Sequence, residues 1–385
     1  MNFAFLSLIV LVVVGGCKKR NFGPTDSESD SLLDPHKLPK QGPWFEGWYI
    51  RITPSSGSQR SLGLIVGSYL PKGASRKEAE ENGLAGYAAV LDGGSQGKPL
   101  RAFEVFPSNT RLYLNKSDIV DRDPAPGGSP SFRWAAEGIG QLTGDAAKID
   151  FPNGVSLSLR LSNAVAWSAD GLGPEGIVSL FRSFPLHWFV HSLRSGVEFE
   201  ATLPAENGSG IEKLSGTGYA HFEKNWGVSF PPAYVWMQAY DAAKNRAIAI
   251  AGGRPVKVGP LSPEAWLAGY RSPSYTIDFA PQNVGTLFES TVDACKGHFE
   301  LVAAHMNRRL SVSARAARNT YGGIAIPRDT GFQKDGSEQS FQTKIVARIF
   351  DVVPFSPLRD KDRLLEESVF ENGALEFGSD FKCNK

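Results

Sequence analysis

Residues 155–162 alternate apolar and polar side chains without a break, and this pattern constrains the fold more than any other feature of the sequence. Successive side chains of a β-strand point to opposite faces of a sheet, so the run predicts a strand with a buried leucine face and an exposed polar face. The same alternation recurs in both halves of the chain, at residues 50–52, 102–106, 111–114, 234–240 and 344–350. Turn residues are abundant, with 41 Gly and 25 Pro, so we expect many short strands joined by turns.

Helical patterns are few and short. We expect one helix over residues 75–82, one that begins at Ser262 with Pro263 at its first position, and one over residues 360–370. A chain of 385 residues exceeds the usual size of a single hydrophobic core, which favours two domains. The sequence therefore predicts an all-β fold of antiparallel strands, a barrel or a sandwich, with few short helices.

A weak internal repeat supports a division into two units. Segments 44–48 and 221–226 both contain Phe-Glu followed closely by Trp, and their glutamates, Glu46 and Glu223, lie 223 − 46 = 177 residues apart. Tandem duplication of one barrel produces such spacing, although two short matches also arise by chance. The expected domains are residues 35–205 and 206–385.

Residues 1–17 resemble an export signal. The apolar run 3–14 is too short to span a bilayer as a helix but has the length of a signal-peptide core. Two glycines then precede Cys17, as in a bacterial lipobox, where the cysteine is lipidated. The alternative is an ordinary signal peptide in which Cys17 is incidental, because no Lys or Arg precedes the apolar run. Residues 18–34 lack periodicity and are expected to form a flexible tether.

We therefore expect an exported lipoprotein held at a membrane, on the periplasmic or cell-surface side, by its lipid anchor. Once Cys17 is lipidated, Cys295 and Cys383 are the remaining cysteines, and in an oxidising compartment they are expected to form one disulfide. Two independent buried thiols are the alternative. The formal net charge of +1 provides no electrostatic footprint for nucleic acid, so no nucleic-acid partner is expected.

Four segments rich in aromatic residues stand out in this strand-rich chain. They read GPWFEGWY, FPLHWFVHSL, GYAHFEKNWG, and SFP followed by YVWMQ, and they occupy residues 42–49, 184–193, 218–227 and 229–238. Tryptophan is a rare residue, so several tryptophans in this order form a fairly specific signature.

In their order and spacing these segments resemble the tocopherol cyclase-like family, from about residue 35 to the C-terminus. The resemblance implies two lipocalin-like β-barrels and an enzyme that closes a ring on a prenylated hydroquinone or another isoprenoid. In such chemistry an acid protonates a double bond, and oxygen captures the carbocation. Related two-barrel proteins are similar to carotenoid hydratases, which add water instead. Neither reaction changes the redox state, so no cofactor is expected.

The resemblance implies three catalytic candidates, namely Glu223, Glu46 and Asn225. A buried glutamic acid can have a raised pKa and remain a neutral proton donor. Glu223 is the leading candidate, whereas Glu46 has an alternative role as a structural anchor beside Trp48. Asn225 could orient a hydroxyl group or hold a turn.

Candidate substrate-binding residues are aromatic or polar and belong to the same segments. Tyr234, Trp236, Gln238 and Tyr240 share one strand face, which suits a ring-shaped ligand that is partly polar. Ordinary core packing is the alternative for such a stripe. The remaining candidates are Trp48, Tyr49, His187 and Trp226. His187 and His191 are spaced too loosely for a zinc pair on a strand, so no metal site is expected.

Three functional classes follow from these patterns. The first is the acid-initiated cyclase or hydratase described above. The second is a non-catalytic, exported lipocalin-like lipoprotein that binds or carries an apolar lipid. The third is a carbohydrate-binding sandwich that uses its tryptophans. In the first two classes the partner is an apolar small molecule, a prenylquinol or a lipid.

Lipidation of Cys17 can be tested by Cys17→Ser. Because the lipobox reading makes this thiol the attachment point of the anchor, we expect the variant to leave the membrane fraction and appear in the soluble fraction. Immunoblots of the two fractions make the measurement. Unchanged membrane partition of the variant would contradict lipidation.

Overall fold

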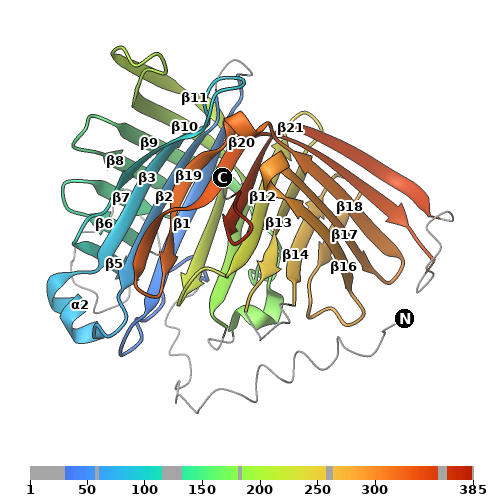
Figure 1. Cartoon of the computed structure of the whole chain (residues 1–385), viewed down its shortest axis with the longest axis horizontal. Helices are drawn as coiled ribbons and strands as arrows, with labels where there is room; N and C mark the ends of the chain where they lie inside the picture. The colour runs from blue at the N-terminus through green and yellow to red at the C-terminus, as the bar shows by residue number, and fades with distance from the viewer. Residues whose placement is uncertain are drawn as a thin grey trace.

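The computed structural model describes residues 31–56, 60–114, 132–180, 184–256, 263–353 and 362–383. Cys17, the export signal and most of the expected tether lie outside these ranges. The described chain forms two curled antiparallel sheets that lie side by side, of eleven and ten strands (Figure 1). The expected all-β class with two tandem antiparallel units and few helices is confirmed, and each of the two expected β-barrels is a sheet curled into a half-barrel.

The first sheet contains the N-terminal half of the chain. Its strands, in spatial order, are β4 (Arg101–Val105), β3 (Ala85–Asp92), β2 (Leu62–Leu70), β1 (Trp44–Pro54), β11 (Ile211–Gly227), β10 (Leu186–Pro204), β9 (Ser156–Val165), β8 (Ala146–Asp150), β7 (Gly140–Thr143), β6 (Phe132–Ala136) and β5 (Thr110–Leu114). Two backbone hydrogen bonds between Leu84 and Thr110 bring its two ends together. The alternating run at 155–162 forms β9, with Leu157 and Leu159 buried.

The second sheet follows from Ala233 onward. Its strands, in spatial order, are β15 (Thr276–Phe279), β14 (Ala265–Arg271), β13 (Arg246–Arg254), β12 (Ala233–Asp241), β21 (Arg363–Ser379), β20 (Gly331–Asp351), β18 (Arg308–Arg315), β17 (His298–His305) and β16 (Leu287–Asp293), and β19 (Gly322–Arg328) pairs with β20. The chain moves from the first sheet to the second between Gly227 and Ala233. Strand β11, which follows the division expected at 205/206, therefore belongs to the first sheet.

Helices are minor elements, as expected, but two of the three helix predictions are wrong. Helix α2 (Arg76–Asn82) lies where expected, and Ser75 caps it by accepting a hydrogen bond from the Glu78 amide. The segment predicted as a C-terminal helix enters β21 at Arg363, because pairing with β20 overrides the local preference. Ala265 begins β14 rather than continuing a helix from Ser262, which lies outside the described residues. The other helical turns are η1 (Gly176–Leu180), η2 (Ala294–Lys296) and η3 (Arg318–Thr320).

Three hydrophobic clusters are buried in this arrangement. One lies inside the curl of the first sheet, one inside the curl of the second, and a third between the two sheets. The third cluster contains several tryptophans and tyrosines, and Glu223 and its hydrogen-bond partners lie in the same region. Within the described residues, no helix is both long and apolar enough to cross a bilayer.

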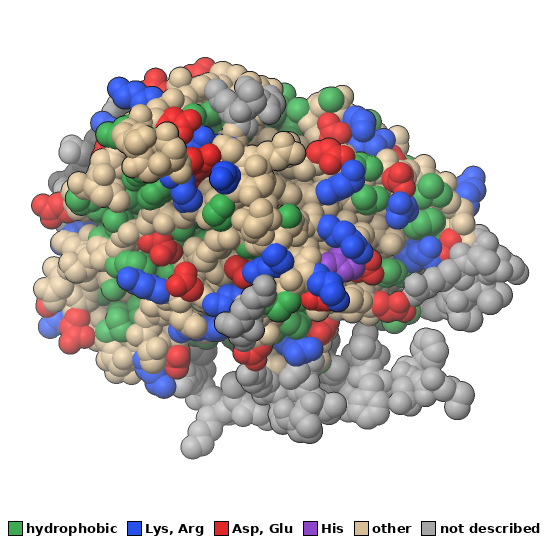
Figure 2. All heavy atoms as spheres, turned by 45° about the horizontal axis from the view of Figure 1, so that its top comes forward, with side chains coloured by type: hydrophobic (Ala, Val, Ile, Leu, Met, Phe, Trp, Pro, Cys, Tyr) green, Lys and Arg blue, Asp and Glu red, His purple; other side chains and the backbone are tan. Residues whose placement is uncertain are grey.

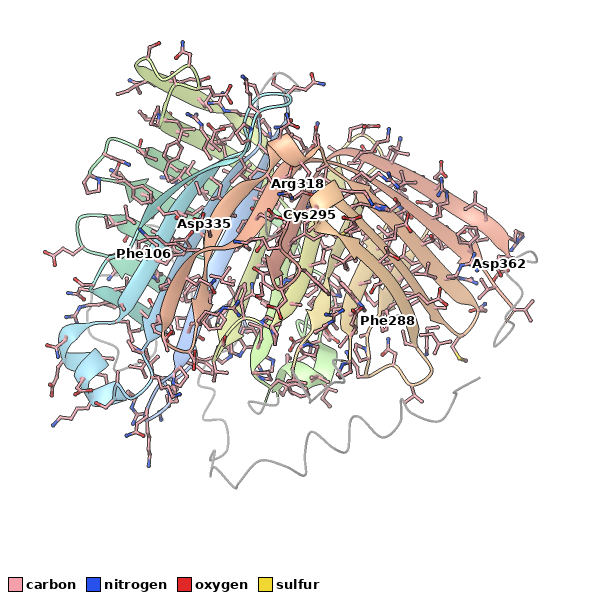
Figure 3. The ribbon with its side chains drawn as sticks, in the orientation of Figure 1. Phe106, Phe288, Cys295, Arg318, Asp335 and Asp362 are labelled. Carbon is pink, nitrogen blue, oxygen red and sulfur yellow. A yellow bond between two sulfur atoms is a disulfide. The ribbon has the colours of Figure 1, made fainter. Side chains whose placement is uncertain are left out.

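The expected disulfide is present, joining Cys295 of η2 to Cys383 in the C-terminal tail. Figure 3 shows Cys295 close to Arg318, whose guanidinium donates a hydrogen bond to the carbonyl of Ala294. The bridge closes a loop of 88 residues. In the chain-entropy model a loop of this length stabilises the folded state by up to about 4 to 5 kcal/mol. Acidic and basic side chains are interspersed over the face in Figure 2, in keeping with the near-zero net charge.

Candidate active site

Strand alternation separates the two candidate acids onto opposite faces of the first sheet. On β11, Phe222 and Trp226 face the core of the first sheet, whereas Glu223 faces the second sheet. On the neighbouring β1, Glu46 lies on the side of that first core, because it contacts Lys224, which stacks over Trp226. Glu46 and Glu223 therefore do not share a site.

Glu223 is the polar centre of the contact between the two sheets. Its Oε2 accepts hydrogen bonds from the indole N–H of Trp188 on β10, at 2.8 Å, and from that of Trp236 on β12, at 2.9 Å. The same oxygen lies 2.9 Å from Nε2 of His221. Since Trp188 belongs to the first sheet and Trp236 to the second, one buried carboxylate oxygen joins them.

His221 extends this network toward an unsatisfied nitrogen. The side chain is 1% exposed, and its Nδ1 has no hydrogen-bond partner among the described residues. When a carboxylate binds one nitrogen of an imidazole, the other nitrogen is held in a defined direction. His221 can therefore accept a proton at Nδ1 while Nε2 bonds to Glu223.

The expected aromatic stripe on β12 faces this cluster. Trp236 bonds to Glu223 as above, and the hydroxyl of Tyr234 donates to Oε1 of Glu376 at 2.6 Å. Gln238 accepts a hydrogen bond from Nη1 of Arg51 at 2.9 Å. Tyr240 lies farther out, packed against Tyr219 with ring centroids 5.0 Å apart. The first three side chains thus belong to the cluster, and Tyr240 lies at its edge.

Glu376 on β21 is a second carboxyl group in the same region. Its Oε1 accepts from Tyr234, and its Oε2 accepts from Nε2 of Gln339 at 3.0 Å. Burial raises the pKa of Glu376 to about 7, and repulsion from Glu223 acts in the same direction. The hydrogen bond from Tyr234 opposes this shift. Near neutral pH this carboxyl group therefore holds a proton part of the time.

Tyr49 interacts electrostatically with both carboxyl groups. Burial raises its pKa well above the ordinary value, Arg51 opposes the shift, and Glu223 and Glu376 both add to it. Its ring meets that of Trp236 edge to face, with centroids 5.1 Å apart. The phenol therefore keeps its proton and can donate a hydrogen bond.

Arg51 supplies the positive charge of the cluster. Its guanidinium donates to Gln238 and to the carbonyl of Asn372, and it lies over the ring of Phe341 at 5.0 Å. Burial lowers the pKa of Arg51 to about 10, which still leaves it charged at neutral pH. One guanidinium and two carboxyl groups thus lie in an interface that also contains many apolar side chains.

Glu46 has surroundings of a different kind. Its Oε1 lies 3.2 Å from Nζ of Lys224 and 2.6 Å from Nδ1 of His36, whose backbone N–H also donates to it. Burial raises the pKa of Glu46, but Lys224 and His36 more than offset that effect, so its pKa lies below the usual value. Such an ionised, ion-paired carboxylate is poorly placed to donate a proton. It fits the alternative role considered for Glu46 from the sequence, that of a structural anchor.

Three of the predicted substrate-binding residues, Trp48, Trp226 and His187, lie near the Glu46–Lys224 ion pair and not near Glu223. Trp48 and Trp226 lie on either side of the Lys224 ammonium, at 5.3 and 5.0 Å from it. His187 stacks on Trp226 at 4.9 Å and lies 2.6 Å, through Nδ1, from a carboxylate oxygen of Glu175. The proposed substrate-binding set is thus divided between two buried clusters. Asn225 follows Glu223 on β11 at a half-buried position.

Sequence reasoning missed four residues of the inter-sheet cluster: Trp188, His221, Arg51 and Glu376. Alternation could have identified His221, which lies two positions before Glu223 on the same strand. Trp188 belongs to one of the four aromatic segments. Glu376 carried no local signal, since only strand pairing brings it opposite Trp236. Within the described part of the chain, no group of three or more His, Cys, Asp or Glu side chains could hold a metal ion.

Two solved structures resemble the fold at low sequence identity. The crystal structure of an AttH-like protein from Nitrosomonas europaea is 11% identical and has a TM-score of 0.45, with 93% of this chain and 99% of that chain covered. Kievitone hydratase from Nectria haematococca is 11% identical and has a TM-score of 0.41, with 87% and 89% covered. No family model matches the chain, and no curated protein matches it. At this level of similarity the two structures indicate no role for any residue of this chain.

The structural role of Glu46 predicts the effect of Glu46→Gln. The substitution removes the carboxylate 3.2 Å from the buried Lys224 ammonium and leaves Asp34 as its acidic neighbour, so we expect the free energy of unfolding to fall by up to about 3 to 5 kcal/mol. Urea unfolding followed by tryptophan fluorescence makes the measurement. Glu371→Gln is the matched control, because it removes the exposed ion pair with Lys344 and should cost less than about 1 kcal/mol. Equal stability of the two variants would contradict this role.

Proposed function

We propose that this protein is an enzyme that adds oxygen to a carbon–carbon double bond of an apolar small molecule, beginning with protonation of that bond. One observation carries the proposal. Two carboxyl groups meet at the aromatic interface in unlike environments: Glu223 is buried on the first sheet, and Glu376 is half-buried on the second. Glu223 is surrounded by three nitrogen groups, whereas the pKa of Glu376 is raised to about 7. Carboxyl pairs in unlike environments are typical of acid and base roles.

Glu376 is the proton donor in this proposal. Its carboxyl proton passes to one carbon of the double bond, the π electrons form the new C–H bond, and the other carbon becomes a tertiary carbocation. The aromatic faces of Tyr49, Trp188 and Trp236 line the interface, and such faces stabilise a cation. The low-water interface also protects the cation from random capture.

His221, held by Glu223, is the base. An oxygen nucleophile attacks the cation, a C–O bond forms, and the proton of that oxygen passes to Nδ1 of His221. The proton then returns to the Glu376 carboxylate, so no net charge or redox change remains. The sequence favoured Glu223 as the proton donor, whereas this proposal gives that role to Glu376. Three nitrogen groups surround Glu223, and this environment favours a carboxylate that accepts hydrogen bonds.

The sequence resemblance supports a finer version of the proposal. In the tocopherol cyclase-like family the nucleophile is a hydroxyl group of the same molecule, so a prenylated hydroquinone would close into a ring. We propose that class of substrate and the corresponding ring closure. We also propose that a lipid anchor at Cys17 holds the enzyme beside the membrane in which such molecules dissolve. No cofactor is required by these steps.

The proposal predicts that Glu376→Gln slows ring closure of a prenylated hydroquinone by about a hundred-fold to ten-thousand-fold, the usual range for a lost general acid. The amide keeps the size of the side chain but has no acidic proton. Chromatography of the chromanol product over time makes the measurement. Glu366→Gln is the matched control: Glu366 also lies on β21 and accepts from a tyrosine, but it pairs with Arg246 away from the cluster. This control should keep wild-type activity.

The same proposal fixes the direction of the pH dependence. Only the protonated form of Glu376 donates, so kcat/KM should fall as the pH rises through about 7, and this decline should be absent in Glu376→Gln. Wild-type turnover by Glu376→Gln would contradict the assignment and make Glu223→Gln the next test. Wild-type protein that binds the hydroquinone without converting it belongs to the carrier class instead.

A further inference from the structure

A cavity lies inside the curl of the second sheet, at one end of that sheet. It has a volume of about 410 Å³, within the usual range for ligand sites, and it lies between β15 and the turn that joins β17 to β18. Strands β15 and β16 are the two edges of the second sheet and are not paired with each other. The sheet therefore stays open at this end, and the cavity occupies the opening.

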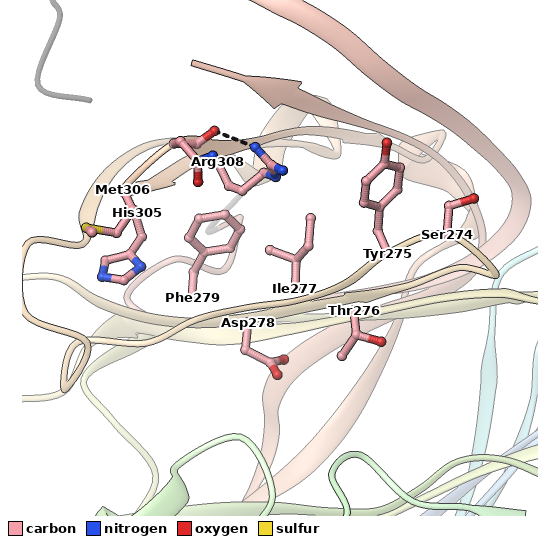
Figure 4. A pocket seen from close by; sticks show the side chains of 10 residues that line it. Ser274, Tyr275, Thr276, Ile277, Asp278, Phe279, His305, Met306 and Arg308 are labelled. Atoms are coloured by element: carbon pink, nitrogen blue, oxygen red, sulfur yellow. Dashed lines mark hydrogen bonds between the residues drawn. The ribbon is translucent and has the colours of Figure 1, made fainter. Parts of the chain in front are cut away.

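One wall of the cavity is apolar. Tyr275, Ile277 and Phe279 alternate along β15 and the residue before it, and Figure 4 shows all three side chains directed into the cavity. Thr276 and Asp278 point to the opposite side of the strand (Figure 4). A half-buried apolar strand face that borders an open cavity favours an alkyl chain or similar apolar group.

The mouth of the cavity also exposes an apolar side chain. Met306, in the turn that joins β17 to β18, lines the cavity and is 61% exposed. Met306 therefore adds to the apolar part of the lining.

The opposite side of the mouth carries a local surplus of positive charge. Arg308 lines the cavity, and its ion pair with Asp351 is shared by Arg363, so two guanidinium groups face one carboxylate. His305 also lines this side. Asp278 also belongs to the lining, but its side chain points to the other side of the strand and pairs with Arg271. An anionic group is therefore favoured next to Arg308.

We infer that this cavity is a binding site for a long-chain fatty acid, with the alkyl chain against Ile277 and Phe279 and the carboxylate next to Arg308. The site is separate from the proposed active site. Phe279 belongs to the core inside the second sheet, whereas Glu376 and Trp236 lie on the other face of that sheet. The inference therefore stands without the proposed enzyme activity.

A dansyl-labelled undecanoic acid tests the inference on the mature protein, through the rise of dansyl fluorescence on binding. We expect saturable binding by the wild type and a loss of affinity of at least about tenfold in Ile277→Asp, which places a charge where the chain lies. Thr276→Asp is the matched control, because it adds the same charge to the opposite side of the strand. Ile277→Trp, which fills the cavity without a charge, replaces Ile277→Asp if that variant does not fold.

A displacement assay tests whether the carboxylate lies next to Arg308. Undecanoic acid should displace the probe better than its methyl ester does, and Arg308→Gln should reduce that difference. Absence of saturable binding, or equal affinities of the Ile277 and Thr276 variants, would overturn the inference. Probe binding that is lost in Trp236→Ala and kept in Ile277→Asp would overturn it as well, since the probe would then lie between the sheets.

Discussion

The hydrogen bonds from Trp188 and Trp236 to one oxygen of Glu223 connect the two sheets, and the remaining polar groups between the sheets are arranged around them. A carboxylate buried among aromatic rings is unfavourable unless donors satisfy it, so the two indoles and His221 have to stay in place. Arg51 and Glu376 lie in the same interface but are satisfied by other partners, Gln238 and Tyr234. The geometry of the proposed active site and the packing of the two sheets thus depend on the same contacts.

Alternation along a strand explains why two similar sequence segments have different roles. Glu46 and Glu223 both follow phenylalanine and precede tryptophan, yet β1 and β11 present them to opposite sides of the first sheet. Glu46 contacts Lys224 and His36 on the side of the first core, and these contacts hold its pKa below the usual value. Glu223 contacts Trp236 of the second sheet. Similar local sequences therefore produce a structural ion pair in one place and the centre of a candidate active site in the other.

Periodicity predicted segments of six of the 21 strands in the described chain, and it predicted the common direction of Tyr234, Trp236 and Gln238, because alternation depends only on neighbouring residues. Glu376 could not be predicted in the same way. It meets Tyr234 and Trp236 through the pairing of β12 with β21, across 376 − 236 = 140 residues, and no local pattern encodes that register. The start of β21 was predicted as a helix for a related reason, since its charged residues favour a helix locally and only pairing with β20 makes it a strand.

Photo-crosslinking tests most directly whether the ligand of this protein lies between the two sheets. A prenylated hydroquinone that carries a diazirine on its prenyl chain would be irradiated with the protein and mapped by peptide mass spectrometry. The account predicts labelled residues on β10, β11, β12 and β21, around Trp188, Glu223, Trp236 and Glu376, and loss of the label in the presence of excess unlabelled hydroquinone. Label confined to β15 and the β17–β18 turn, or to the core of the first sheet, would contradict it.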